Sequence, residues 1–529
     1  MQASPQLTAQ TCLIYIKLKV ENKIRFWNIP FIVLLLGAFV TVFNIGVTGV
    51  AIPSIAKALN ANGLQIHLIA DSLTLTLSAF VLLAGALGDK YGRKKLFIAG
   101  SCLMLVASTF MSFSTDANVL IFWRFVAGIA TAMLFPTTLS MISTIFQNPK
   151  QKILAIGMWS GVAAGGAAIA PVVSGLLLHF FPWGAVYLIS APITFAAILL
   201  GFFYLHEVKN QNAPSIDYLG GFLSVIAISC LLFSIILYPV AAYFYHFVLL
   251  LFAAAITSFV LFVIRELTTK NPLLNVRVFK NIRFSVACFV ITLVAFAQLG
   301  VMFLAQLFVQ NVLGYNTIQA GLSPVPLALA VVIFSPISAK LDARFGSKLT
   351  IASGLFFVGF GFATALFWTT HSSYLQIFLS YITIGIGMGL TMTPATNTIM
   401  NSLPAAQAGV ASAMNDITRD LGDSLGIAIN GSIAAVSYST LLHKVYNNLP
   451  PAERIPISQN VASTITSSLT GAISVADRYP ANANELLAAA RQAFLHGQIN
   501  AMMLSVILCA IGIVVVMIFM PGRQTKSSD

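Results

Sequence analysis

Four ionisable residues stand close together in one apolar stretch, residues 408–434. They are Asp416, Arg419, Asp420 and Asp423. A helix turns by about 100° per residue, so the three acids would cover an arc of roughly 60°, with Arg419 beside them. Such a group cannot face lipid, and it must line an aqueous cavity or pair internally. Two neighbouring acids repel when both are ionised, so the group could attract a cation and exchange a proton.

A simpler interpretation of these four residues is a salt-bridged helix that lies nearer the membrane surface. Two further charged residues lie in or beside apolar stretches. Arg124 falls inside residues 118–144, where it needs a partner or water, unless its side chain extends to the outer interface. Asp71 begins the stretch 66–88, and it is either a further acid of the site or an N-cap at the interface.

The composition indicates which elements must position these residues. Hydrophobic residues make up 58% of the chain and charged residues 8%, with a mean hydropathy of +0.90. A soluble domain carries about 25% charged residues, so the sequence predicts an integral membrane protein. Apolar runs long enough to span a bilayer as helices recur fourteen times. They cover residues 30–54, 66–88, 96–114, 118–144, 153–179, 183–205, 218–238, 246–265, 284–310, 317–340, 348–369, 374–400, 408–434 and 498–520.

The distribution of basic residues tests this count of spans. The net charge of +13 could suggest a nucleic-acid partner, but most Lys and Arg residues lie in short loops between the apolar runs. With the N-terminus inside, 21 of the 28 Lys and Arg residues fall on the cytoplasmic side, 5 outside and 2 within spans. Only an even number of spans with both termini in the cytoplasm gives this distribution.

The turn between the second and third spans contains Gly85, Asp89, Gly92 and Arg93. Asp89 is expected to cap the following helix, and Gly92 permits a bend that a side chain would resist. The spacing of these four residues resembles the signature loop of the major facilitator superfamily. Residues 338–348 resemble a degraded copy of this turn, as expected for two related six-helix halves.

Glycines spaced four residues apart occur in the fifth span, and they would let another helix approach closely. Pro171 in the same span removes a backbone hydrogen bond and can bend the helix. The pattern resembles the antiporter motif of the drug exporters in this superfamily. It consists of Gly157, Gly161, Gly165, Pro171 and Gly175.

The first and thirteenth spans also resemble those of the drug exporters. Asn44 stands where the family's first span has the acid that carries the proton, opposite the arginine at the position of Arg124. Asn44 cannot ionise, so the first span does not supply this carrier. In the thirteenth span, Asp416 and Asp420 fit the pattern of the fourteen-helix branch, and Asp423 is an additional acid. The proton or cation sites expected from this resemblance are Asp416, Asp420, Asp423 and Asp71, with Arg124 and Arg419 as their charge partners.

The resemblance implies an all-α membrane protein with the major facilitator fold. It would have two six-helix halves plus two inserted linker helices, which makes 14 transmembrane helices. A short amphipathic helix is expected at residues 485–494, within an external loop. The expected regions are a cytoplasmic tail 1–29, an N-terminal half 30–206, linker helices 207–266, a C-terminal half 267–522 with the external loop 435–497, and a cytoplasmic tail 523–529.

This branch implies a secondary transporter that exports amphipathic drugs or toxic compounds, including cationic ones, in exchange for protons. Its partners would be a small amphipathic substrate, protons and the lipid bilayer, for a monomer in the cytoplasmic membrane. An exporter of a lipid or endogenous metabolite, with altered or absent proton coupling, is the nearer alternative, and a membrane-embedded enzyme is the remote one. The 7 His are dispersed and no phosphate-binding loop motif is present, so we expect no enzyme activity, cofactor, metal or nucleic-acid partner.

Overall fold

The computed structural model describes residues 28–61, 63–146, 148–208, 216–237, 241–274, 276–404, 407–448, 465, 469–476 and 483–521. Within these ranges every regular element is a helix, and 14 helices are long and apolar enough to cross a membrane. The fold class and the number of spans expected from the sequence are therefore confirmed. Residues 1–27 of the predicted N-terminal tail lie outside the described residues, as does the whole C-terminal tail 523–529.

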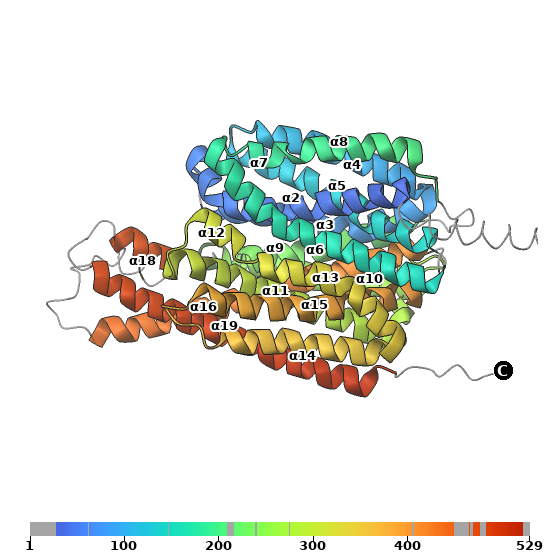
Figure 1. Cartoon of the computed structure of the whole chain (residues 1–529). Helices are drawn as coiled ribbons and strands as arrows, with labels where there is room; N and C mark the ends of the chain where they lie inside the picture. The colour runs from blue at the N-terminus through green and yellow to red at the C-terminus, as the bar shows by residue number, and fades with distance from the viewer. Residues whose placement is uncertain are drawn as a thin grey trace, which may run out of the picture.

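The first group of helices occupies the upper part of Figure 1, in blue to teal. Asp116 starts one of them, because its carboxylate accepts hydrogen bonds from the backbone N–H of Asn118, at 2.7 Å, and of Val119. Pro192 lies near the break between the last two helices of this group, which together form one span. These helices are α2 (Ile29–Leu59), α3 (Gly63–Tyr91), α4 (Arg93–Ser112), α5 (Ala117–Ile145), α6 (Pro149–Phe180), α7 (Ala185–Leu188) and α8 (Ser190–Tyr204).

Two helices follow that were expected as an insertion, α9 (Tyr218–Leu237) and α10 (Ala241–Thr268). They pack against each other and α9 packs against α3, where a Cβ atom on Gly221 would lie 2.9 Å from Leu83. The outer face of α10 is strongly exposed and apolar, as a surface that faces lipid must be.

The second group of helices fills the lower part of Figure 1, in yellow to red. Two of its helices, α12 and α15, begin with a capping box, in which the first polar residue and a glutamine three residues later satisfy each other's backbone N–H. The elements are η3 (Val276–Lys280), α11 (Ile282–Leu307), η4 (Phe308–Val312), α12 (Thr317–Leu322), α13 (Val325–Phe345), α14 (Ser347–Ala365), α15 (Tyr374–Ser402), α16 (Ala408–Asn448), α18 (Leu469–Ala476) and α19 (Ala483–Phe519).

Two hydrophobic cores correspond to these two groups. One core is built almost entirely from α2 to α8 and takes in only Met400, Ala408 and Ala411 from later helices. The other is built mainly from α11 to α19, and a few residues of α3, α5 and α10 join it. This arrangement is compatible with the expected two halves, and the exact domain boundaries stay a prediction.

The expected external loop 435–497 is largely helical where the structure describes it. Helix α16 continues to Asn448 and α19 begins at Ala483, so both spans extend well beyond the apolar segments. Residues 485–494, expected as a separate short helix, form the first turns of α19. Gly497 follows them without ending the helix, and it packs closely against the carbonyl oxygen of Ala434 on α16. Figure 1 shows these extensions and α18 projecting at the left.

The turn after α3 and the turn after α13 have the same backbone feature. Gly92 has a φ of 118° and Gly346 a φ of 83°, and both values lie in a region that side chains disfavour. At Gly92 a Cβ atom would also collide with the carboxylate of Glu207. The repeated turn expected from the sequence is therefore present in the backbone.

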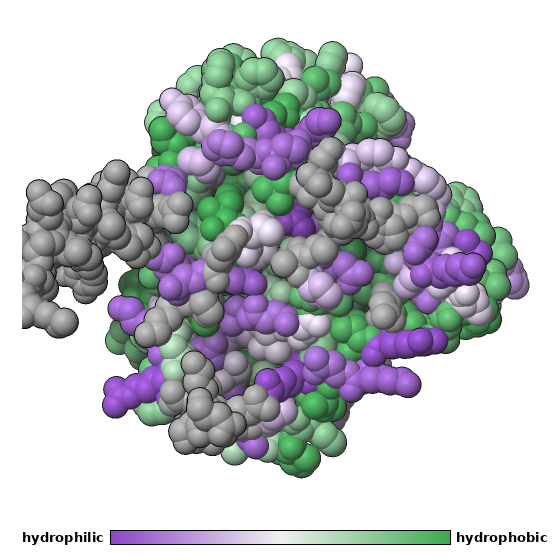
Figure 2. All heavy atoms as spheres, turned by 90° about the vertical axis from the view of Figure 1, so that its right-hand side faces the viewer, coloured by the Kyte–Doolittle hydropathy of each residue, from purple (hydrophilic) through white to green (hydrophobic). Residues whose placement is uncertain are grey.

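Figure 2 looks at the end of the molecule that carries the last residues of α19, where hydrophilic patches interrupt the apolar surface.

Candidate functional site

The charged residues of α16 form a compact group, as the helical spacing predicts. Asp416 is fully buried, and its Oδ1 atom accepts hydrogen bonds from Arg419 Nη2, at 3.3 Å, and from Asn415 Nδ2, at 3.1 Å. Arg419 Nε lies 4.0 Å from Oδ1 of Asp420, which is 7% exposed. Asp423 is half-buried on the same helix and has no hydrogen bond to any described residue. Asp416, Arg419 and Asp420 thus interact directly, and Asp423 stands apart.

Two helices of the first group complete the surroundings of these charges. Ser78 on α3 donates a hydrogen bond to Asp420 Oδ2 at 3.0 Å. The guanidinium carbon of Arg419 lies 4.7 Å from the ring centroid of Phe135 on α5. Phe135 in turn lies 4.9 Å from the ring of Trp159 on α6. The charged group therefore lies where the two groups of helices meet, which the sequence alone could not show.

One carboxylate oxygen of this group is unsatisfied. Oδ2 of Asp416 is buried and has no hydrogen-bond partner among the described residues. An unpaired carboxylate oxygen in an apolar interior costs several kcal/mol, so binding a proton or a cation there relieves that cost. Chemically, the α16 group can therefore exchange protons or hold an organic cation.

A second polar network surrounds Arg124 inside the first group of helices. The Arg124 side chain is fully buried, so it does not extend to the outer interface. It donates hydrogen bonds to Thr48 Oγ1, at 2.6 Å, and to the carbonyl oxygen of Ala70, at 3.0 Å. Arg124 Nε has no partner among the described residues. Asp71 follows Ala70 on α3, and no ion pair joins its carboxylate to Arg124.

Asn44, at the expected position of the proton-carrying acid, does not bind Arg124. Its Nδ2 atom donates to the carbonyl oxygen of Val40 at 2.9 Å, within its own helix. Its Oδ1 atom accepts a hydrogen bond from Ser190 on α8 at 3.4 Å. The amide is thus buried and satisfied by neutral groups, and Arg124 has only neutral hydrogen-bond partners among the described residues.

The expectation that Asp89 caps α4 is wrong. Asp89 lies in the last turn of α3, and the N-cap residue of α4 is Gly92. Its carboxylate accepts hydrogen bonds from Arg93 Nη2, at 2.7 Å, and from the backbone N–H of Gly409 at 3.1 Å. Glu207 instead accepts from the backbone N–H of Lys94 near the start of α4.

This contact makes Asp89 a link between the two groups of helices. Gly409 lies in the first turn of α16, where free N–H groups and the helix dipole favour a carboxylate. The two backbones are close here, because a Cβ atom on Gly85 would lie 2.6 Å from the carbonyl oxygen of Gly409. Arg93 fixes the carboxylate and is itself bound by Thr144 of α5 at 3.0 Å. We refer to Asp89, Arg93 and Gly409 as the α3–α16 latch.

The glycine-rich face of α6 packs against α13. A Cβ atom on Gly157 would lie 3.1 Å from the carbonyl oxygen of Ser335, and one on Gly161 would lie 3.4 Å from that of Val332. At Gly165 the nearest atom is a Val332 methyl group at 3.6 Å. The close helix approach expected from the spacing is thus present. Further along α6, the helix continues through Pro171, and Gly175 is buried.

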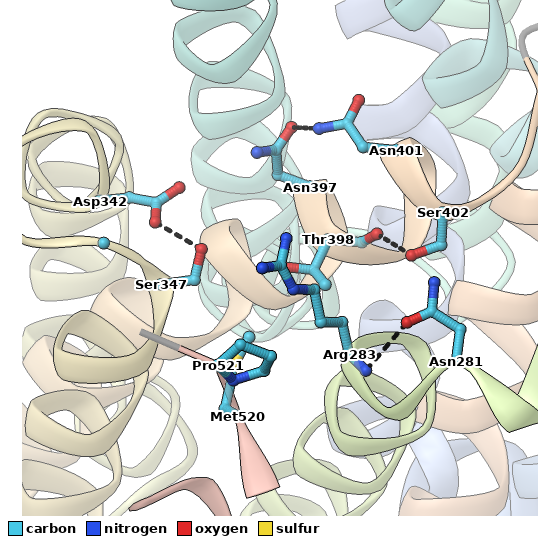
Figure 3. A pocket seen from close by; sticks show the side chains of 11 residues that line it. Asn281, Arg283, Asp342, Ser347, Asn397, Thr398, Asn401, Ser402, Met520 and Pro521 are labelled. Carbon is cyan, nitrogen blue, oxygen red and sulfur yellow. Dashed lines mark hydrogen bonds between the residues drawn. The ribbon is translucent and has the colours of Figure 1, made fainter. Parts of the chain in front are cut away.

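A separate polar pocket of about 390 Å³ opens at the end of the molecule seen in Figure 2. Figure 3 shows Arg283, Asn397 and Asn401 among its lining residues, with Asp342 accepting a hydrogen bond from Ser347 at 2.6 Å. None of the site residues expected from the sequence lines it. The pocket is therefore distinct from the α16 group.

The comparisons with known proteins agree with this architecture. The family model of the Major Facilitator Superfamily matches residues 34–427. Because this match covers most of the chain, the protein belongs to the major facilitator superfamily, a superfamily of membrane transporters and not of enzymes. It is a multi-pass protein of the lipid bilayer, and it transports a small substrate.

Individual proteins that are similar to this chain include two sequence relatives and one solved structure. The chain is 31% identical over 450 residues to the multidrug efflux pump LfrA of Mycolicibacterium smegmatis, covering 84% of this chain and 87% of that protein. It is 29% identical over 451 residues to the methyl viologen resistance protein SmvA of Salmonella typhimurium, with 84% and 88% covered. The crystal structure of the human organic anion transporter MFSD10 superposes with a TM-score of 0.58 at 12% identity, over 92% of this chain and 98% of that one. This last likeness concerns the fold alone.

Proposed function

We propose that this protein is a secondary active transporter that exports amphipathic drugs, including cationic ones. The family and the named efflux and resistance relatives support export of drugs. The observation that carries the cationic part is the α16 group, in which three acids stand with a single arginine where the two groups of helices meet. Alternating access would expose this group first to one side of the membrane and then to the other.

Proton exchange is the coupling that these residues support. Asp416 and Asp420 are the carriers in this proposal, because they share Arg419 and one oxygen of Asp416 is unpaired. Asp423 attracts cations, and Asp71 is the acid nearest along the chain to the Arg124 network. Asn44 cannot take this role. The transporter acts as a monomer in the inner membrane in this proposal, and its basic loops support a cytoplasmic position of both termini.

Reconstitution in liposomes with an acidic lumen tests this coupling. Protons that leave the lumen should drive methyl viologen, a hydrophilic cation that does not cross lipid unaided, inwards, and collapse of the pH gradient by nigericin with equal potassium on both sides should stop its accumulation. The double variant Asp416→Asn/Asp420→Asn should lower this accumulation by at least about tenfold, because neither position can then carry a proton. Exchange of labelled for unlabelled cation without a pH gradient should persist.

The matched control is Glu485→Gln, which neutralises an exposed acid in the first turn of α19. It should accumulate the cation like the unchanged protein. If the double variant also does so, Asp416 and Asp420 are not the carriers and Asp71 becomes the next candidate. If the unchanged protein moves lipid analogues and no drug, the substrate assignment is wrong.

A further inference from the structure

Arg419 is held by partners from both groups of helices. On its own helix it contacts Asp416 at 3.3 Å and Asp420 at 4.0 Å. Across the interface its guanidinium lies over the ring of Phe135, 4.7 Å from the centroid. An aromatic face and two carboxylates are the groups that bind a delocalised or quaternary organic cation. The guanidinium thus occupies the position that such a cation would prefer.

The contacts of Arg419 are loose in comparison with those of a structural ion pair in the same protein. In the α3–α16 latch, Arg93 approaches Asp89 to 2.7 Å and its side chain is only 4% exposed. The Arg419 side chain is 26% exposed, and its two carboxylate contacts are longer. Oδ2 of Asp416 stays unpaired although the guanidinium is adjacent. Arg419 therefore satisfies the acids incompletely and is accessible enough to move.

We propose that Arg419 is an internal placeholder cation that an aromatic or quaternary organic cation displaces from Phe135 and from the acids of α16. This inference rests on the proposed function and adds how the site selects its substrate. A neutral compound cannot replace the guanidinium, because it offers the two carboxylates no charge. The bound cation then takes over the link between Phe135 on α5 and Asp416 and Asp420 on α16.

Direct binding to the purified full-length protein tests the proposal without any transport. The probes are tetraphenylphosphonium, an aromatic cation, and triphenylphosphine oxide, a neutral compound of similar shape, each followed by calorimetry. Arg419→Gln removes the competing cation and should tighten binding of tetraphenylphosphonium by about fivefold or more, with no gain for the neutral probe. Arg419→Lys retains a cation, so its affinity for tetraphenylphosphonium should lie between that of the unchanged protein and that of Arg419→Gln. Arg265→Gln is the control, since Arg265 pairs with Asp217 away from this site.

Substitution of Phe135 gives a second and more specific test of the placeholder role of Arg419. In the unchanged protein, Phe135→Leu weakens the hold on both the probe and Arg419, so the two losses partly cancel and binding should change by less than about twofold. In the Arg419→Gln background only the probe loses the ring, and Phe135→Leu should weaken its binding by about threefold or more. This dependence on the background is what a purely structural Arg419 would not produce.

The possible outcomes separate this proposal from the proposed function. Equal or weaker binding of the cation to Arg419→Gln, in protein that remains monodisperse, overturns the placeholder role. If Arg419→Gln cannot be purified, Arg419→Lys must bind about twofold more tightly than the unchanged protein, and unchanged or weaker binding refutes the role. A protein that shows the expected binding pattern but exports no drug from cells would contradict the proposed function and leave this inference intact.

Discussion

At the scale of single residues, the buried charges of this protein differ in how completely they are satisfied. Asp89 accepts hydrogen bonds both from Arg93 and from the backbone of Gly409. Arg419 is held loosely, and Arg124 donates its hydrogen bonds only to neutral partners among the residues that the structure describes. A tight pair suits a contact that holds two elements together, and a loose one suits a site whose occupant changes.

The latch predicts a specific effect of Asp89→Asn. The amide loses the charge that Arg93 and the start of α16 stabilise, which should cost about 1–2 kcal/mol and shift the population by roughly 5- to 30-fold towards the state in which α3 and α16 separate. Transport should fall while the protein still inserts. A cysteine at Ser412, a fully buried position on α16, should then react faster with an impermeant thiol reagent in inside-out vesicles.

Asp342→Asn is the matched control for this experiment. Asp342 occupies the repeated turn after α13, but its carboxylate accepts a hydrogen bond from Ser347 within the same turn and not from the other group of helices. Its replacement should leave the cysteine reactivity at position 412 unchanged. Equal effects of both variants would show that the turn around Asp89 contributes general stability and is not a latch.

At the scale of elements, the α6–α13 contact depends on the absence of side chains. The room available along α6 increases from Gly157 to Gly165, as the distances of 3.1, 3.4 and 3.6 Å from each hypothetical Cβ atom to its nearest neighbour show. The first two neighbours are backbone atoms, which cannot rotate away. The third is a side-chain methyl group, which can.

A series of leucine substitutions should follow this order. Gly157→Leu should cost about 1–3 kcal/mol and lower the melting temperature and the transport rate most, followed by Gly161→Leu and then Gly165→Leu. Gly49→Leu on α2 is the control, since no described atom of another helix lies within 4 Å of its Cβ position. Melting curves and transport by the same preparations check the prediction, and an effect of Gly49→Leu as large as that of Gly157→Leu would contradict it.

Most elements could be predicted from the sequence, because hydropathy marks each span and lipid requires it to be a helix. The same signal fails beyond the bilayer, where α16 and α19 continue as helices through polar residues. Site residues on one helix, such as Asp416, Arg419 and Asp420, could also be predicted from spacing. Ser78 and Phe135 could not, because an ordinary serine and phenylalanine become partners of those charges only through tertiary packing.

At the scale of the whole molecule, the arrangement is asymmetric despite its repeated turns. Gly92 and Gly346 give both turns a positive φ, yet among the described residues Asp89 bonds to the other group of helices and Asp342 bonds within its own turn. The last described residues of the chain line the polar pocket at the same end as the turn after α13. That end should therefore face the cytoplasm if the basic loops set the orientation.

Cysteine labelling of intact cells checks this orientation. In a protein without its native cysteines, a cysteine at Asn484, exposed at the start of α19, should react with an impermeant reagent. A cysteine at Lys95, exposed on the first turn of α4, should react only after the membrane is permeabilised. The reverse pattern would place both termini outside.

The burial of Arg124 also bears on how the chain enters the membrane during its synthesis. An arginine in a spanning segment costs up to about 2.5–3.5 kcal/mol on insertion, the value at the helix centre, and Arg124 lies nearer the start of α5. The acceptors that receive its hydrogen bonds, Thr48 on α2 and Ala70 on α3, both precede α5 in the chain. The same order holds for α16, because its partners on other helices, Ser78 and Phe135, are translated long before it. The charges of α5 and α16 therefore leave the ribosome after these partners on other helices, so neither Arg124 nor the α16 group has to wait in lipid for them.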